Sequence, residues 1–382
     1  MTRNSRLRLV GALVLACSLL EGSSIEGSAR AAGRLRTYYI AADTVSWDYV
    51  PGGTDEITGR PFADSAFFAK SPPQPVGTTY LKAQYREYTD STFTTLKPRP
   101  PAWQHLGFLG PLIRATVGDT IRVVFRNNTD HPCSIHPHGV FYHKDSEGAP
   151  YNDGTSGADK ADDAVPPGGT HVYTWPVPAR AGPGPGDPSS IMWMYHSHTD
   201  EIHDVNAGLI GPMVITARGK ARTDGTPVDV DREFVTGFIQ VEEQDSWYAG
   251  RNLRPPPAGD RPVANPSIPQ SIYPYFVKFT INGFTHGTLP LASMTMRKGE
   301  RVRWYVFAST NDFDFHTPHW HGNTVLIGHM RTDVTFVGAM QMVVADMVPD
   351  NIGTWLYHCH ISFHLAEGMQ ARYAVVGRQR AE

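Results

Sequence analysis

Short runs of apolar and β-branched residues, separated by glycine and proline, dominate the pattern along this chain. Runs such as 120–125 and 302–307 are rich in Val, Ile, Phe and Tyr, a composition typical of strands. No segment shows the sustained helical periodicity of an amphipathic helix. With 36 glycines and 31 prolines available for turns, the pattern predicts an all-β protein of sandwiches or barrels rather than a parallel sheet with crossover helices.

Two parts of the chain repeat the same order of motifs. The segment Gly118-Asp-Thr-Ile-Arg-Val-Val-Phe leads to a His-x-His-Gly motif 18 residues after its glycine, and Gly299-Glu-Arg-Val-Arg-Trp-Tyr-Val leads to another after 20 residues. Further on, a second His-x-His pair in each part is followed by a glycine, Gly208 or Gly368. Two copies of one domain explain this repetition most simply.

The repeats predict the domain organisation. We expect copy one at residues 35–218 and copy two at 231–378, joined by the polar stretch 219–229. Inside copy one, residues 145–190 are rich in Gly, Pro and Asp, which predicts a long surface loop, and residues 51–75 have a similar composition. A length of 382 residues with 40% apolar content is sufficient for two cores of ordinary size.

The net charge and the N-terminal residues indicate which binding partners to exclude and where the protein is located. The formal net charge is -3, so no basic field points to nucleic acid or an anionic membrane. Three arginines precede the apolar run 9–20, a pattern that predicts a signal peptide over residues 1–31 and a secreted or periplasmic protein without a membrane span. A buried helix or a retained anchor is the alternative. Removal of this segment would leave Cys133 and Cys359, too few cysteines for a disulfide framework.

Ten of the 17 histidines fall in four compact groups. Eight of them form four His-x-His pairs, and residues i and i+2 of a strand project from the same face. One such pair would usually be structural, but four pairs at matching places in two repeats favour a metal, because imidazole is a common neutral metal ligand. The groups are His136 and His138; His196 and His198; His316, His319 and His321; His358, His360 and His364.

The last group adds sulfur ligands. Cys359 lies between the two histidines of the last pair, and His364 and Met369 follow it five and ten residues later. Together with His316, these residues supply two imidazoles, a thiolate and a thioether, which is the ligand set of blue copper sites. Zinc is the alternative metal, but structural zinc sites seldom use methionine. A lone cysteine is usually a small buried hydrophobe, whereas the flanking histidines favour a copper ligand here.

Four motifs of this chain resemble the signature motifs of the multicopper oxidases. They are His136-Pro-His-Gly139, His196-Ser-His198, His316-Thr-Pro-His-Trp-His-Gly322 and His358-Cys-His-Ile-Ser-Phe-His-Leu-Ala-Glu-Gly-Met369. The residues after the second motif are most similar to ceruloplasmin-type domains, while the two-domain size resembles the bacterial small laccases. The resemblance spans both repeats and implies two cupredoxin-like Greek-key β-sandwich domains.

The resemblance also implies four copper ions per chain. A type 1 copper would be held by His316, Cys359 and His364, with Met369 as a weak axial ligand. A trinuclear cluster would be held by the paired histidines: the type 2 copper by His136 and His319, and the type 3 pair by His138, His196, His198, His321, His358 and His360. Cys359 and its neighbours His358 and His360 would form the electron transfer path between the two sites.

Copy one has lost the type 1 ligands. Aligning the repeats places Cys133 opposite His316 and Ser197 opposite Cys359, and it places Asp204 near His364. Leu209 stands opposite the methionine. We therefore expect one type 1 copper per chain, in the second domain. His203, beside Asp204, is the one residue that could still act as a type 1 ligand in the first domain.

The implied reaction couples four one-electron oxidations of a small donor to the reduction of O2 to water. The donor would reach the type 1 copper through the imidazole edge of His316 or His364. Phenols, aromatic amines, Fe(II) and Cu(I) all give single electrons to such sites, and the docking loops are not fixed by the motifs. In the resembling two-domain oxidases four histidines from each of two subunits meet, so a head-to-tail homotrimer is expected.

The proton donor has no motif in this sequence. The positions after the His-Cys-His triplet where many laccases carry an acid are Ser362 and Leu365 here. Asp200, Glu201 and Asp204 lie near the second histidine pair and are candidates, with a solvated loop acid as the alternative role of each.

Three kinds of alternative function are compatible with some of the motifs. Within the resembling family the chain could be a ferroxidase or a cuprous oxidase, although the 11 methionines form no Met-rich tract. A copper nitrite reductase needs three histidines at its catalytic copper, so eight paired histidines favour O2 reduction. A copper-binding protein with a vestigial cluster is the non-enzymatic alternative, and the complete ligand sets argue against it.

Overall fold

Strands form where apolar and polar residues alternate. The structure is a computed structural model that describes residues 33–62, 77–252, 277–309 and 314–377. In β6 (Thr120–Asn127), Ile121, Val123 and Phe125 are fully buried, whereas Arg122 between them is exposed. Strand β14 (Val302–Ser309) is buried along its whole length because it lies inside a sheet. Strands greatly outnumber the short helices, which confirms the predicted all-β class.

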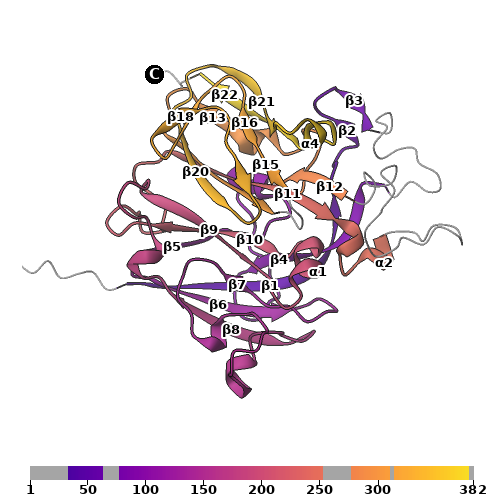
Figure 1. Ribbon diagram of the computed structural model, residues 1–382, viewed down its shortest axis with the longest axis vertical. Coiled ribbons are helices and arrows are strands. Elements are labelled where there is room, and N and C mark those ends of the chain that lie inside the picture. Colours follow the sequence, from indigo (N-terminus) through magenta and orange to yellow (C-terminus); the bar gives the residue numbers. More distant parts are fainter. Residues whose placement is uncertain (1–32, 63–76, 253–276, 310–313, 378–382) are drawn as a thin grey trace, which may run out of the picture. The chain divides into compact units, whose positions relative to one another are not determined.

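Strands before residue 217 form two four-stranded sheets (Figure 1). The first has the order β4-β1-β6-β8, with β1 (Leu35–Asp48), β4 (Thr79–Tyr88) and β8 (Thr170–Pro176). The second has the order β5-β10-β9-β7, with β5 (Ile113–Thr116), β7 (His136–Pro137), β9 (Ser190–His196) and β10 (Ile210–Thr216). A short pair joins β2 (Thr54–Asp55) to β3 (Arg60–Pro61).

Strands after residue 231 form a six-stranded and a four-stranded sheet. The larger has the order β12-β11-β14-β20-β17-β18, with β11 (Arg232–Glu242), β12 (Val277–Ile281), β17 (Val325–Ile327), β18 (Met330–Thr332) and β20 (Met342–Met347). The smaller has the order β13-β22-β21-β16, with β13 (Thr295–Arg297), β16 (Pro318–Trp320), β21 (Gly353–Cys359) and β22 (Gln370–Val376). A short pair joins β15 (Phe315–His316) to β19 (Val337–Gly338).

The two halves use the same strand pairings. Strand β1 is parallel to β6 as β11 is parallel to β14, and β5 is parallel to β10 as β13 is parallel to β22. Strand β9 is antiparallel to both β10 and β7, and β21 is antiparallel to both β22 and β16. This equivalence favours two copies of one domain, and we retain 35–218 and 231–378 as the proposed domain boundaries.

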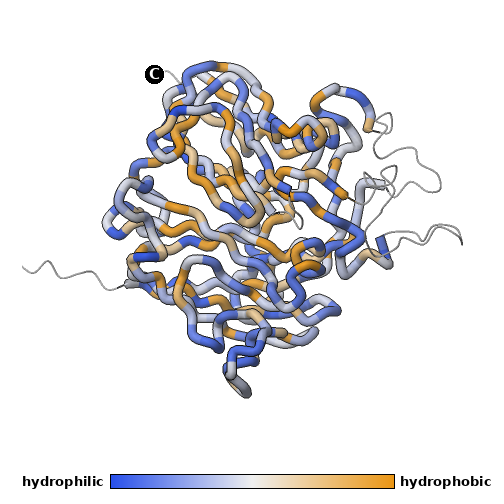
Figure 2. Tube along the Cα trace, in the orientation of Figure 1, coloured by the Kyte–Doolittle hydropathy of each residue, from blue (hydrophilic) through white to orange (hydrophobic). Residues whose placement is uncertain are grey.

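Each half has its own apolar core. Phe125 and Trp175 belong to the first, and Trp304 and Trp320 to the second. A third cluster contains residues of both halves, such as Met194 with Tyr305. In Figure 2 the apolar stretches, drawn in orange, recur along the strands of both halves.

Buried polar contacts also link the halves, and residues from 33 onward form one compact unit. Glu243 is fully buried in the 3-10 turn Glu243–Asp245. It accepts hydrogen bonds from Lys82 Nζ at 3.0 Å and from the Tyr49 hydroxyl at 2.5 Å. Arg114 pairs with both oxygens of Glu233 at 3.0 and 2.8 Å. Such buried, geometrically specific pairs fix how two surfaces meet more than they add stability.

The prediction of one long loop over residues 145–190 was wrong in part. Strand β8 lies inside it, pairs with β6 and buries Tyr173 and Trp175. The Gly, Pro and Asp residues belong to the connections around this strand, which contain the 3-10 turns Lys144–Ser146, Gly157–Lys160 and Ala179–Ala181. The alternation of Val, Tyr, Thr and Trp at residues 172–175 indicates a strand, but the many Gly, Pro and Asp residues on either side of it led to the prediction of a loop. Of the loop predicted at 51–75, residues 63–76 lie outside the described residues.

The helices are short, and two of them follow histidine pairs. Helix α1 (Glu201–Ala207) comes after His198, and α4 (Ser362–Ala366) comes after His360; α2 (Ala249–Asn252) and the 3-10 helices Pro101–Leu106 and Leu291–Met294 lie elsewhere. Among the helices described, none has the length and apolarity that a membrane crossing requires. The predicted signal segment 1–31 lies outside the described residues.

A glycine closes each His-x-His-Gly motif against a tryptophan. Gly139 has φ +76° and Gly322 has φ +71°, values that side chains with a Cβ rarely adopt. A Cβ at these positions would lie 2.2 Å from the Trp193 ring and 2.4 Å from the Trp355 ring. Each tryptophan stands three residues before the first histidine of the second pair in its half, so the same packing supports both histidine sites.

We therefore expect Gly139→Ala and Gly322→Ala each to lower the free energy of unfolding by about 2 kcal/mol or more, from left-handed strain and overpacking together. The measurement is chemical denaturation of the purified protein. Gly154→Ala is the control, because Gly154 has φ +79° but open space around its Cβ position, and only the strain term of about 1–2 kcal/mol applies to it. Equal losses in all three variants would contradict the packing argument.

Candidate metal centres

Strands β7 and β9 bring the two histidine pairs of the first half together. They are antiparallel, with His136 opposite His196, and opposed residues of a sheet have Cβ atoms about 5 Å apart. The ring of His136 lies 5.2–5.6 Å from the rings of His138, His196 and His198. Nε2 of His138 and Nε2 of His196 are 3.1 Å apart. These four residues are called the first quartet.

Strands β16 and β21 build the equivalent group in the second half. They are antiparallel, with His319 opposite His358. Nε2 of His358 lies 2.9 Å from Nε2 of His321 and 3.3 Å from Nδ1 of His319. The His360 ring is 5.1 Å from that of His319 and 5.5 Å from that of His358. These four residues are called the second quartet, and three of them, His319, His321 and His358, could hold a metal ion as placed.

Backbone carbonyls set the orientation of several rings. Nδ1 of His136 lies 2.7 Å from the Glu147 oxygen, that of His196 lies 2.9 Å from the Ser197 oxygen, and that of His358 lies 2.7 Å from the Cys359 oxygen. A carbonyl only accepts, so Nδ1 carries the proton in each ring. Nε2 is then left with its lone pair, as a metal ligand requires.

Burial keeps several of these imidazoles neutral. Burial, with a smaller contribution from neighbouring imidazoles, lowers the pKa of His138 and His358 to about 4 and that of His196 to about 3. Neutral rings whose ring nitrogens lie about 3 Å apart gain little from one another, whereas a cation between them would bind all of their lone pairs.

The two quartets do not touch within the chain. All eight histidines are described, and no ring contact or hydrogen bond joins one quartet to the other. Each quartet is also open on one side: His360 is exposed, and the side chain of His198 is 39% exposed. Each half therefore presents half of the predicted trinuclear site.

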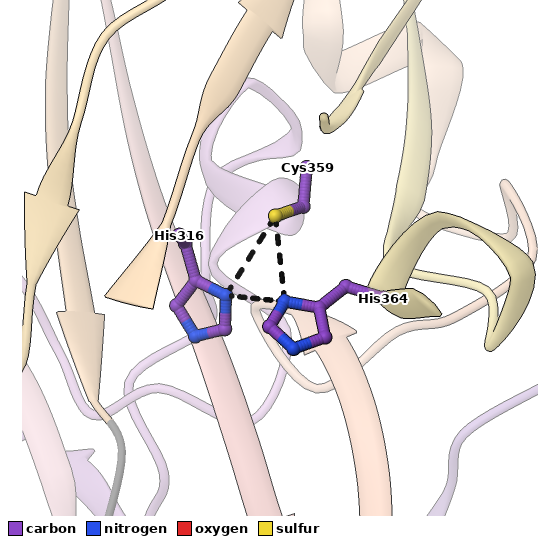
Figure 3. A group of neighbouring side chains, drawn as sticks. All are labelled: His316, Cys359 and His364. Atoms are coloured by element: carbon purple, nitrogen blue, oxygen red, sulfur yellow. Dashed lines mark hydrogen bonds between the residues drawn. The ribbon is translucent and has the colours of Figure 1, made fainter. Parts of the chain in front are cut away.

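His316, Cys359 and His364 form a third group, fully inside the second half (Figure 3). Sγ of Cys359 lies 3.8 Å from Nδ1 of His316 and 3.5 Å from Nδ1 of His364, and the two nitrogens are 3.2 Å apart. They come from β15, the last residue of β21, and α4. Burial raises the pKa of the Cys359 thiol, so the thiolate needs a cation beside it to persist.

Met369 belongs to the same neighbourhood. Its side chain is fully buried in the core of the second half. Its carbonyl accepts from the Cys359 N–H at 3.1 Å, and its own N–H donates to the His364 carbonyl at 2.9 Å. The backbone thus ties the residue predicted as axial ligand to two of the other three.

The outer nitrogens of the two rings differ in their surroundings. Nε2 of His364 lies 2.8 Å from Oδ2 of Asp314, a side chain that is 27% exposed. Nε2 of His316 is buried and has no hydrogen-bond partner among the described residues. Sequence reasoning missed Asp314, because an acid two residues before His316 matches no motif.

Acids near the quartets are placed as follows. Of the three candidate acids, Glu201 lies 3.4 Å from Nε2 of His198 and 3.9 Å from Nδ1 of His196, so its side chain contacts the first quartet. Asp333, which no motif indicated, lies 3.7 Å from Nε2 of His319. Asp200 instead pairs with His203 at 2.9 Å.

The first half has no group equivalent to His316, Cys359 and His364 among the described residues that could hold a metal. Ser197 and Asp204 are hydrogen-bonded to each other at 2.6 Å, and Cys133 is buried nearby in the apolar core. His203 stacks on Trp247 at 4.6 Å and pairs with Asp200, which leaves it engaged elsewhere.

The donor sets fit copper. A buried thiolate between two neutral imidazoles, next to a methionine, offers the soft and borderline ligands that copper prefers in both oxidation states. The quartets offer imidazole nitrogens alone, and backbone carbonyls fix the tautomers of His136, His196 and His358 in the form that copper sites of histidine require.

Comparisons with known proteins agree with this chemistry. Two family models, each described as multicopper oxidase, match residues 104–220 and 267–379. The chain is 41% identical over 348 residues to the ferroxidase HEPHL1 of Mus musculus, with 89% of this chain and 29% of that protein covered. It is 41% identical to hephaestin of Rattus norvegicus, covering 90% and 30%, and 36% identical to ceruloplasmin of Homo sapiens, covering 89% and 32%. The chain thus spans roughly a third of the length of these relatives.

Solved structures share the fold. A multicopper oxidase crystal structure superposes with a TM-score of 0.54 at 18% identity, covering 90% of both chains. A blue copper oxidase from Nitrosomonas europaea has a TM-score of 0.54 at 15% identity, covering 90% of this chain and 86% of that one. The motif order, the donor geometry and the sequence matches agree, and the chain belongs to the multicopper oxidase family, whose members bind copper.

Proposed function

We propose that this chain is a copper oxidase that couples four one-electron oxidations of a small donor to the reduction of O2 to water. The observation that carries the proposal is that Cys359 belongs to the thiolate group while its two neighbours in sequence belong to the second quartet. Bound copper would supply the one-electron redox chemistry and the four-electron capacity. The proposed ligands are His316, Cys359, His364 and Met369 for type 1; His136 and His319 for type 2; His138, His196, His198, His321, His358 and His360 for type 3.

The protein's own part in electron transfer is a short covalent connection. From Sγ of Cys359 the backbone leads in one direction to His358 and in the other to His360. The hydrogen bond from Nδ1 of His358 to the Cys359 carbonyl, 2.7 Å, adds a second contact along the same path. A rigid connection of this kind holds both groups at a fixed separation.

Copper-loaded protein is expected to show the blue thiolate charge-transfer band, a near-ultraviolet band of the coupled type 3 pair, and O2 uptake with a reductant. A nitrite reductase would lack the coupled-pair band, and a non-catalytic copper protein would lack O2 uptake. Cys359→Ser should abolish the blue band and lower kcat by at least about 100-fold, while retaining the near-ultraviolet band, because the quartets are untouched. Retention of the blue band in this variant would contradict the assignment.

The donor is expected at His364. Both rings are buried, but the outer nitrogen of His316 has no partner among the described residues, whereas that of His364 reaches the partly exposed Asp314, which supports His364 over His316. Exposed Phe315 and Phe363 lie next to these residues in sequence. The carboxylate and the aromatic rings together suit an aromatic amine or phenol.

Fe(II) is the second candidate donor, because relatives of this chain bear the name ferroxidase. The carboxylate of Asp314 would attract such a cation. Among the described residues, however, two clusters of three or more His, Cys, Asp or Glu side chains are placed to hold a metal. They are the group of His316, Cys359 and His364 and the group of His319, His321 and His358, and neither is a separate iron site. O2 uptake with a phenol, Fe(II) and Cu(I) in parallel ranks the donors.

Asp314→Asn should raise the reduction potential of the type 1 site, because it removes a negative charge hydrogen-bonded to a ligand ring. We expect kcat/KM for Fe(II) to fall by about tenfold through the lost attraction, and that for a neutral phenol to fall less. Asp350→Asn removes the same charge from an exposed loop and serves as the control. Steady-state O2 uptake and redox titration of the blue band are the measurements; equal effects in both variants would count against Asp314 as the docking residue.

We further propose a head-to-tail homotrimer in which the first quartet of one subunit meets the second quartet of its neighbour. Each quartet is open and contacts no other histidine of the other half within the chain. Each quartet has one exposed side, at His198 in the first and at His360 in the second, and a ring of subunits would close this side of each site.

Complementation tests this arrangement. One variant carries His138→Ala and His196→Ala, and the other carries His321→Ala and His358→Ala; each alone should lack the near-ultraviolet band. Co-expressed at equal levels, they should recover about one quarter of wild-type activity if subunits mix randomly, because one partner supplies the intact first quartet and the other the intact second. If the cluster were built within one chain, co-expression would restore no activity, and this result would contradict the shared cluster. Sedimentation of the wild-type protein measures whether it is a trimer.

Export is proposed on the pattern at the N-terminus alone. Arginines followed by an apolar run and small residues are typical of signal peptides, and an exported oxidase would meet its donor outside the cytoplasm. Cleavage of the precursor, followed by N-terminal sequencing of secreted protein, checks it.

A further inference from the structure

The first half fills its lost type 1 position with hydrogen bonds instead of a metal. Ser197 stands between the histidines of a His-x-His pair as Cys359 does; Ser197 directly follows β9 and Cys359 ends β21, two strands that pair in the same way. Helix α1 then follows the pair as α4 does in the second half. Asp204 lies in α1 as His364 lies in α4. The two residues thus differ in chemistry but lie on corresponding helices.

Asp204 collects three hydrogen bonds while fully buried. Its Oδ2 accepts from the Ser197 hydroxyl at 2.6 Å and from the Asp200 N–H at 2.9 Å. Its Oδ1 accepts from Nε1 of Trp247 at 2.9 Å. Burial raises the pKa of Asp204, and these three donors oppose that rise. The carboxylate therefore links the middle of the histidine pair, the start of its own helix α1 and the distant Trp247.

Ser197 is held from all sides as a result. Its hydroxyl oxygen also accepts from the Ser134 N–H at 3.0 Å, and its own N–H donates to the Leu209 carbonyl at 3.0 Å. Its carbonyl accepts from Nδ1 of His196 at 2.9 Å. His198 is tied through its N–H to the Ser134 hydroxyl at 3.1 Å. The residue between the two imidazoles is therefore fixed before any metal binds.

We propose that Asp204 is a positioning residue for the first quartet: it replaces, without a metal, the tie that copper would provide between Cys359 and His364 in the second half. The inference rests on the proposed function, since it treats His196 and His198 as copper ligands. The backbone around Cys359 has the same hydrogen bonds as that around Ser197, so the difference between the halves lies in the side chains: Ser197 is bonded to Asp204 at 2.6 Å in the apo chain, whereas the corresponding link between Cys359 and His364 would be completed by the type 1 metal.

A role in stability alone explains the carboxylate less well. A buried carboxylate costs more to desolvate than an apolar side chain of similar size, and apolar replacements of buried charged groups are often neutral or stabilising. Retaining a charge that engages Ser197, Trp247 and the start of α1 instead fixes one arrangement of these segments. Partners that orient metal ligands behave in this way, and their loss costs about 10- to 100-fold in metal affinity or activity.

Asp204→Asn is the test variant, in the full copper-loaded protein. An amide has one acceptor oxygen, so its NH2 must face either Ser197 and Asp200 or the Trp247 N–H, and donors meet donors on one side. We expect the ratio of the near-ultraviolet band to the blue band to fall by about tenfold, with the blue band itself unchanged because it reports the second half. Adding Trp247→Phe removes one donor and should restore most of the ratio.

Asp200→Asn is the matched control. It makes the same charge change four residues away, at a side chain that pairs with His203 and does not touch Ser197, and its backbone N–H is retained. The ratio should stay at the wild-type value. An unchanged ratio in Asp204→Asn, a fall shared by Asp200→Asn, or a loss that Trp247→Phe does not reverse would each overturn the inference. A wild-type protein that lacks the near-ultraviolet band would instead overturn the proposed function.

Discussion

The register of two antiparallel strand pairs is the constraint on which both quartets depend. His136 faces His196, and His319 faces His358, so the spacing of two within each His-x-His pair places four rings around one point. A slip of one residue would turn every ring to the other face of the sheet. Gly139 and Gly322, packed on Trp193 and Trp355, help to fix this register in both halves.

The same register produces two sites of different completeness. The thiolate group closes within the second half, because its members lie on β15, β21 and α4 of one core. The quartets lie at strand ends and remain open. Because buried pairs such as Lys82 with Glu243 fix the two halves against each other, the chain has little freedom to fold one quartet onto the other. Completion of the cluster then falls to a neighbouring subunit, as we propose.

The sequence predicts the features that depend on residues close together along the chain. The all-β class, the repeat and the grouping of histidines depend on spacings of two residues and on motif order, which are visible without a structure. Asp314 and Trp247 escaped prediction because their contacts with His364 and Asp204 depend on how loops and helices pack. Strand β8 escaped it because glycine and proline around residues 170–176 outweighed a short alternation. The roles of individual ligands stay proposals, which geometry supports but spectra must test.

The choice of donor turns on how charge and aromatic surface combine at His364. The relatives named ferroxidases are more than three times as long as the part that this chain matches, which covers 29% of each, so their names do not fix the donor here. Among the described residues, one carboxylate, that of Asp314, meets the outer nitrogen of His364, and Phe279 stacks on the same ring at 4.5 Å. A single carboxylate attracts a cation but does not hold it, since Fe(II) needs several oxygen or nitrogen ligands. An aromatic amine needs one acceptor and an apolar surface, and exposed Phe315 and Phe363 provide that surface. These features support the proposed aromatic donor, with Fe(II) as the second candidate.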